Sequence, residues 1–203
     1  MLRVGVLVSG RGSNLQALLD AQRAADFPAR VVLVGCNRAH APAIQRAEAA
    51  GVPVCLTDRA AVPERAKRQA LMLEVLQAAG VDLVVLAGFD EILSEAFLAA
   101  YPDRIVNTHP SLLPAFGGTM HAVADALAHG VKISGCTVHL VTDDLDNGPI
   151  LLQRSVEVRD DDDVESLHAR IRDEEHRLLP LVVRAFAEKR VRIEGKRARV
   201  VAS

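Results

Sequence analysis

The sequence has neither a strong charge bias nor a long apolar run. Its 24 Lys and Arg residues and 26 Asp and Glu residues give a formal net charge of −2. The chain therefore has no general attraction for nucleic acid, and a phosphate-bearing ligand needs a local site. The N-terminal apolar run reaches Ser9-Gly10 at once, too short for a signal peptide or a membrane span. We expect a cytoplasmic chain with no nucleic-acid partner and no membrane association.

Cysteine is also scarce. The three cysteines, Cys36, Cys55 and Cys136, are odd in number, far apart, and set in apolar or small-residue runs. This pattern predicts reduced interior residues in preference to disulfides or metal ligands. The CxxC and HExxH motifs are absent, and we expect no metal site.

No Ser/Pro-rich linker, repeat or low-complexity tract divides the chain. Half of the 203 residues are apolar and a quarter are charged, which suffices for a core without disulfides or structural metal. We predict a single domain over residues 1–203. The sequence leaves open whether this domain is a monomer or a homodimer.

The apolar pattern predicts an α/β fold with a doubly wound, mainly parallel sheet. Short apolar runs at 2–9, 30–36, 82–88 and 104–107 alternate with helical segments expected at 14–25, 42–50, 61–79, 91–100, 120–129 and 164–187. Pro42 suits a first helical position, Asp163 can cap the last helix, and Pro180 should kink it. Two further β-like runs, 132–141 and 149–158, have no helix between them, so we expect appended antiparallel strands there.

A glycine-rich segment, SGRGSNLQ at 9–16, follows the first expected strand. Backbone amides at a helix N-terminus can hold a phosphate group. The alternative is a simple tight turn in which Ser13 or Asn14 caps the helix. The segment lacks the third glycine of the dinucleotide fingerprint and the lysine of a P-loop, so neither of those two nucleotide sites is expected.

Three polar residues form a candidate catalytic group. Asn107 and His109 stand at alternate positions where an expected strand ends, so their side chains share a face. Asp146 lies in a loop with a glycine and a proline that can hold its carboxylate rigidly. Alone, each could be structural. Together they supply an oxyanion donor, a titratable group and an orienting carboxylate, the parts that acyl transfer needs. A serine hydrolase is disfavoured because Ser111 follows Pro110 and no GxSxG motif occurs.

These segments, together with LAGF at 86–89, NTHPSLLP at 107–114 and TDDLDNGP at 142–149, resemble the folate-dependent formyltransferases that act on glycinamide ribonucleotide. The likeness covers nearly the whole chain. The segment at 107–114 and the LDxGP loop are shared with other formyltetrahydrofolate enzymes, whereas GSNLQ points to the ribonucleotide. The resemblance implies formyl transfer from 10-formyltetrahydrofolate to the amine of glycinamide ribonucleotide in purine biosynthesis, without a metal.

The resemblance also implies roles for residues. Asn107 and a protonated His109 would stabilise the tetrahedral oxyanion, and Asp146 would organise His109 and water. The acceptor would be held by Gly12, Ser13, Asn14, Arg172 and Glu175, although an exposed helical ion pair is the alternative for the last two. The folate would be held by Arg65, Leu86, Ala87, Phe89, Ile92, Leu93 and Val141, with Arg65 facing its glutamate tail. Core packing is the alternative for Leu86 and Leu93.

One position departs from the family pattern. Asp90 and Glu91 stand where familiar members carry an apolar residue and an arginine, so we expect two acids to repel the anionic folate tail. Two other functions remain open. A formyltetrahydrofolate hydrolase would use water as acceptor, but those relatives carry an additional N-terminal domain. A non-catalytic nucleotide-binding module could use the same fold.

Overall fold

The computed structural model describes residues 1–201 and divides into two compact units, Met1–Val106 and Asn107–Ser203. The expectation of a single domain stays a prediction. None of the helices described within residues 1–201 is long and apolar enough to cross a membrane.

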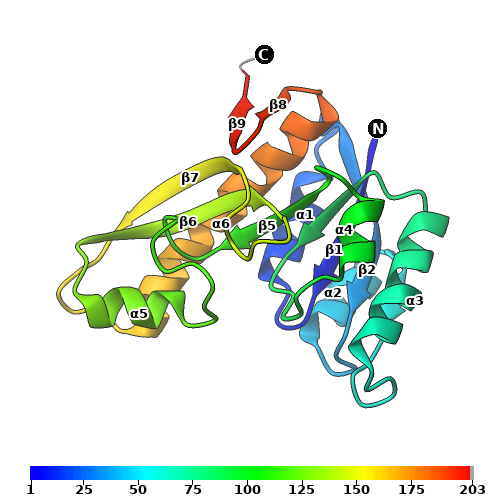
Figure 1. Cartoon of the computed structure of the whole chain (residues 1–203), viewed down its shortest axis with the longest axis horizontal. Coiled ribbons are helices and arrows are strands. Elements are labelled where there is room, and N and C mark those ends of the chain that lie inside the picture. The colour runs from blue at the N-terminus through cyan, green and yellow to red at the C-terminus, as the bar shows by residue number, and fades with distance from the viewer. Residues whose placement is uncertain (202–203) are drawn as a thin grey trace. The chain divides into compact units, whose positions relative to one another are not determined.

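The first unit holds a parallel sheet that contains strands β1 (Leu2–Val8), β2 (Ala29–Cys36), β3 (Val54–Leu56) and β4 (Leu83–Leu86), in the order β3-β2-β1-β4 (Figure 1). From Val4 onward β1 is buried, and all of β4 is buried. Continuous burial is typical of parallel strands that are covered on both faces.

Four helices connect and cover these strands: α1 (Ser13–Ala21), α2 (Pro42–Ala49), α3 (Arg65–Ala78) and α4 (Glu95–Ala100). Helix α2 packs on α1, β2 and β3, while α3 packs on α4 and β3. Pro42 opens α2 as expected, because its missing N–H lies where a helix makes no internal hydrogen bond. Strand β5 (Ile105–His109) follows and crosses the boundary between the units.

The second unit is mainly antiparallel. Its elements are α5 (Ala122–His129), β6 (Ile133–Leu140), β7 (Ile150–Glu157), α6 (Val164–Ala187), β8 (Val191–Glu194) and β9 (Arg197–Val200). Strands β6 and β7 are antiparallel, and α6 packs along both (Figure 1). Asp163 caps α6 in a reciprocal capping box with Ser166, and the helix continues past Pro180. The β8–β9 hairpin joins β7 through one parallel pair, Ile150 with Arg197.

The predicted α/β fold with a parallel sheet and appended antiparallel strands is confirmed. Three expected helices begin later than predicted, at Arg65, Glu95 and Ala122, because capping and turn residues precede them. The sequence-based prediction missed β3 and the β8–β9 hairpin. Strand β3 has only three residues, too few for a periodic signal, and the hairpin strands are rich in charge.

The three cysteines are free thiols. Cys36 and Cys136 are buried as expected, whereas Cys55 is only half-buried. Burial raises the pKa of all three, that of Cys136 to about 12. Thiols with raised pKa values are poor nucleophiles near neutral pH, which agrees with a structural role.

Candidate active site

The glycine-rich segment forms the start of α1. The N-cap residue is Gly12, with φ 71° and ψ 32°, and it has no side chain to accept a hydrogen bond from the first turn. The alternative in which Ser13 or Asn14 caps the helix is therefore wrong. A Cβ at position 12 would also lie 2.7 Å from the Cβ of Ala43. Both the left-handed backbone and the close approach of α2 require glycine here.

Helix α2 fixes the shape of this segment. The N–H of Ala43 donates to the Gly10 carbonyl at 3.2 Å. The guanidinium of Arg46 donates to the Arg11 carbonyl at 2.9 Å and to Gln16 Oε1 at 3.1 Å. These contacts hold the backbone of the segment in place without a ligand, as an anion site built from backbone amides requires.

The loop after β4 meets the loop after β1. The Ser9 N–H donates to the Gly88 carbonyl, and the Asp90 N–H donates to Ser9 Oγ, both at 3.0 Å. In parallel sheets ligands bind at this edge, beyond the carboxyl ends of the strands. The first unit therefore places its phosphate-loop candidate beside its folate-loop candidate.

The folate-loop residues differ in exposure. Leu86, Ala87 and Leu93 are buried, which agrees with core packing as their first role. Phe89 is half-buried and Ile92 is 59% exposed, so both leave apolar surface uncovered within the described residues. Arg65, the first residue of α3, is exposed.

Asp90 and Glu91 are not free acids. They lie in an ion-pair cluster with Arg38, Arg59 and Arg68, and Asn37 donates to both carboxylates at 3.0 Å. Glu91 Oε1 lies 2.8 Å from Arg68 Nη2 and 3.0 Å from Arg59 Nε, and the Glu91 side chain is only 5% exposed. Three guanidinium groups surround two carboxylates.

Burial works against the charge of both acids, yet the arginines and Asn37 hold the pKa of Asp90 and of Glu91 below their usual values. The acids therefore stay ionised and neutralised inside the cluster. The expected repulsion of an anionic tail does not follow, because the cluster as a whole carries one more positive than negative charge. The partners that neutralise the two acids lie 23 to 54 residues away in the sequence, so the sequence pattern around Asp90 did not reveal them.

In the second unit, Asn107, His109 and Asp146 converge. His109 Nδ1 lies 3.3 Å from Asp146 Oδ2. His139 of β6 lies between Asn107 and Asp146, with its Nε2 at 3.2 Å from Asn107 Nδ2 and at 3.5 Å from Asp146 Oδ1. The end of β5, the end of β6 and the loop that carries Asp146 thus meet at one point.

His139 was missed by the sequence analysis. It is 2% exposed and its Nδ1 contacts the Leu140 carbonyl at 2.9 Å. The available signal was a histidine inside an otherwise apolar strand, alternating with Thr137. Alone, such a histidine indicates a satisfied core residue as readily as a site residue.

Both ring nitrogens of His109 face acceptors. Nε2 donates to the Phe116 carbonyl at 2.8 Å, and Nδ1 faces the Asp146 carboxylate. A neutral imidazole has one N–H, whereas an imidazolium has two, so the cationic ring satisfies both neighbours.

The Asp146 loop is tightly constrained. Asp146 has φ 54°, and a Cβ at Gly148 would come 1.9 Å from the Leu140 carbonyl oxygen. Burial opposes ionisation, but His139, the Gly118 N–H at 2.9 Å and the charge of His109 keep the pKa of Asp146 below its usual value. Asp146 is therefore a fixed anion beside His109.

Ser111 is not a nucleophile in this arrangement. Its side chain is fully buried, and its Oγ donates to the Ala115 carbonyl at 2.6 Å. Thr137 Oγ1 accepts from the Leu113 N–H and donates to the Ser111 carbonyl. This network supports the turn after His109.

The remaining predicted residues lie on α6 and after β6. Glu175 is 4% exposed and Arg172 is half-buried, so the alternative of an exposed ion pair is wrong for Glu175. The neighbouring charges do form solvated helical pairs, as with Arg177 and Glu174. Val141 is half-buried directly after β6. Residues 1–201 contain no cluster of three or more potential metal ligands.

The chain belongs to the Formyl transferase family, whose pattern matches residues 2–183. It is 49% identical to the phosphoribosylglycinamide formyltransferase of Mycobacterium tuberculosis over 97% of this chain and 90% of that protein. The crystal structure of glycinamide ribonucleotide transformylase 1 from Symbiobacterium toebii matches with a TM-score of 0.96 and 51% identity, covering 100% of this chain and 95% of that one.

A structure with a different activity in its title is also similar. The formyltetrahydrofolate deformylase from Pseudomonas syringae matches with a TM-score of 0.92 and 27% identity. It covers 99% of this chain, but this chain covers only 66% of it. The shared fold therefore does not separate transfer from hydrolysis, whereas the identity and two-sided coverage of the transferases favour transfer.

Proposed function

We propose that this chain transfers the formyl group of 10-formyltetrahydrofolate to the amine of glycinamide ribonucleotide in purine biosynthesis. The observation that carries the proposal is the convergence of Asn107, His109 and Asp146 in a member of the Formyl transferase family. The relatives named for this reaction, which match over nearly their whole length, support the acceptor.

The chemistry follows from the groups at the site. The acceptor amine attacks the formyl carbon, and the C=O π electrons move onto oxygen to give a tetrahedral oxyanion. Asn107 Nδ2 has two N–H groups, so its contact with His139 leaves one for the oxyanion. The C–N bond to the folate then breaks as a proton passes from the attacking nitrogen to the folate nitrogen.

The roles of His109 and Asp146 concern the negative charge that develops on the formyl oxygen. His109, as a cation, stabilises the oxyanion, and the fixed carboxylate of Asp146 stabilises the imidazolium and orders water for proton transfer. The amine is itself the nucleophile, so the reaction needs no covalent enzyme intermediate. In this proposal the rate enhancement comes from positioning of the substrates and from electrostatic stabilisation.

In this proposal the acceptor phosphate binds the amides of Gly12, Ser13 and Asn14, with Arg172 and Glu175 as further acceptor contacts. The uncapped start of α1 supports the phosphate site. The folate lies against Arg65, Leu86, Ala87, Phe89, Ile92, Leu93 and Val141. The partners are these small molecules, in a cytoplasmic monomer or homodimer.

Replacing Gly12 with alanine should raise the KM for glycinamide ribonucleotide by about tenfold to a hundredfold, because strain at such a position costs about 1–3 kcal/mol. The new Cβ would clash with Ala43 and disfavour φ 71°. Gly10→Ala is the matched control, since a Cβ there meets nothing within 4 Å. Steady-state kinetics at saturating folate measures both. Equal changes of this KM in the two variants would contradict the proposed phosphate site at Gly12.

A steady-state assay tests the function itself. Purified protein is mixed with 10-formyltetrahydrofolate, and folate release is followed with and without glycinamide ribonucleotide. We expect release to depend on the acceptor, with formylated ribonucleotide formed in equal amount. Acceptor-independent release would instead assign the chain to the hydrolases, and no release would favour the non-catalytic module.

A further inference from the structure

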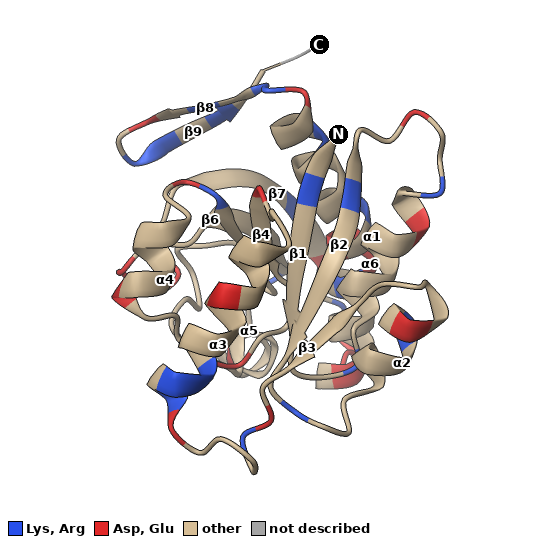
Figure 2. Cartoon of the chain, turned by 90° about the vertical axis from the view of Figure 1, so that its right-hand side faces the viewer, with Lys and Arg blue, Asp and Glu red and all other residues tan. Residues whose placement is uncertain are grey.

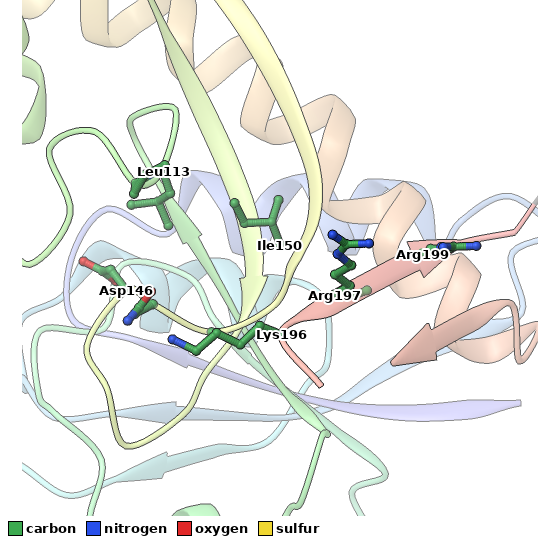
Figure 3. Close-up of a pocket in the computed structure, with 10 residues that line it drawn as sticks. Leu113, Asp146, Ile150, Lys196, Arg197 and Arg199 are labelled. Atoms are coloured by element: carbon green, nitrogen blue, oxygen red, sulfur yellow. The ribbon is translucent and has the colours of Figure 1, made fainter. Parts of the chain in front are cut away.

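A pocket lies between the Asp146 loop and the C-terminal hairpin of the second unit (Figure 3). Its volume is about 520 Å³ and its lining comprises Leu113, Pro114, Asp146, Asn147, Gly148, Ile150, Lys196, Arg197, Ala198 and Arg199. The volume falls within the range of about 300–1,000 Å³ that is usual for small-molecule sites. None of the roles proposed above uses the hairpin.

The hairpin brings a concentrated positive charge to this pocket. Residues 189–199 contain six basic residues and one acidic residue, hence a net charge of +5 in a chain whose net charge is −2. The Lys and Arg colouring marks β9 in Figure 2. Three of these basic residues, Lys196, Arg197 and Arg199, line the pocket and are exposed.

These three cations have no anionic partner among residues 1–201, whereas the neighbouring Arg190 pairs with Glu188 at 2.6 Å. Arg197 lies opposite Glu194 in the hairpin register but forms no ion pair with it. Asp146, the one carboxylate among the described lining residues, faces His109, His139 and the Gly118 N–H. The positive charge of the pocket is therefore not neutralised from within.

The two walls of the pocket have different chemistry. Lys196 extends toward Asp146, and Arg197 and Arg199 follow along β9 (Figure 3). The remaining lining includes apolar side chains, Leu113, Pro114, Ile150 and Ala198. A ligand that suits both walls has an apolar body and an acidic group, since guanidinium groups bind carboxylate and phosphate by charge-assisted hydrogen bonds.

We propose that this pocket binds a small organic anion, with its carboxylate or phosphate group on Lys196, Arg197 and Arg199 and its apolar body against Leu113, Pro114 and Ile150. The bound anion would link the hairpin to the Asp146 loop. That link matters because, within residues 1–201, the strand pairing between β9 and β7 consists of one residue pair, Ile150 with Arg197.

The test is a titration of the ¹⁵N-labelled full chain, followed by backbone amide chemical shifts. Phenyl phosphate and benzoate are the anionic probes, and neutral benzamide, at the same ionic strength, is the control ligand. We expect saturable shifts at residues 147, 148, 150 and 196–199 with the anions and none with benzamide. A response to only one anion identifies phosphate or carboxylate as the group that the pocket selects.

The double change Arg197→Gln and Arg199→Gln should weaken anion binding about tenfold or more, since it removes both guanidinium groups that would make charge-assisted hydrogen bonds to the anion. Arg192→Gln is the matched control: it is exposed on the same hairpin but lies outside the lining, and binding should not change. Equal affinity in the double variant, or equal shifts with benzamide, would overturn the inference. Shifts confined to residues 12–14 would also overturn it while leaving the proposed acceptor site intact.

Discussion

Replacing Asn107 with alanine should lower kcat by about a hundredfold to a thousandfold, the usual loss for one oxyanion donor. The amide of Asn107 reaches the same point as His109 and Asp146. The hydrogen bond that its N–H donates becomes strong only as negative charge develops on the formyl oxygen. We therefore expect turnover to fall more than acceptor binding. Steady-state kinetics with both substrates varied measures the two effects separately.

His109→Ala should cause a loss at least as large, because it removes the imidazole that faces the Asp146 carboxylate. The double variant should lose much less than the product of the two single losses, since the residues act as a unit. Thr119→Ala is a control from the neighbouring loop, where Thr119 bonds Asp125 at 3.1 Å, and it should retain turnover. Near-normal turnover in His109→Ala would return this histidine to a structural role.

Replacing Glu91 with arginine should destabilise the protein by about 3–5 kcal/mol, the cost of removing one partner from a buried ion pair. The new cation would stand among Arg59 and Arg68, where Glu91 Oε1 now accepts from both. This expectation replaces the view that Glu91 acts by repelling the anionic folate tail. Urea unfolding at pH 7 measures the change in the free energy of unfolding.

A charge exchange provides the control. In the double variant Glu91→Arg with Arg68→Glu, opposite charges again face each other, and we expect part of the stability to return. Pairs in contact show such coupling, whereas distant substitutions add. Purely additive losses would show that the cluster does not act through the Glu91–Arg68 pair.

The same cluster predicts a pH dependence. Because the pKa of Glu91 is lower in the folded protein than in the unfolded chain, its stabilisation is present above about pH 4.3, the unfolded value. It is lost as pH falls through the folded pKa, where the carboxylate takes up a proton. The stability difference between wild type and Glu91→Gln should therefore shrink at acidic pH, as unfolding at pH 7 and pH 3.5 would measure.

The sequence by itself determined the order of the elements and the chemistry of the candidate site. Alternating apolar and helical segments predicted the parallel strands, and Pro42 and Asp163 marked helix starts that the structure confirms. Asn107, His109 and Asp146 were identified from their positions after strand ends and from a resemblance carried by adjacent motif residues. Such signals are local, so a sequence displays them directly.

Tertiary structure alone decided which charges meet. From the sequence, Asp90 and Glu91 were expected to repel an anionic folate tail, yet Arg38, Arg59 and Arg68 from distant segments neutralise them. Likewise, only the structure shows that His139 of β6 and the basic residues of β9 lie near the Asp146 loop. The reason is physical: electrostatic interactions depend on separation in space and on burial, and neither can be read from separation along the chain.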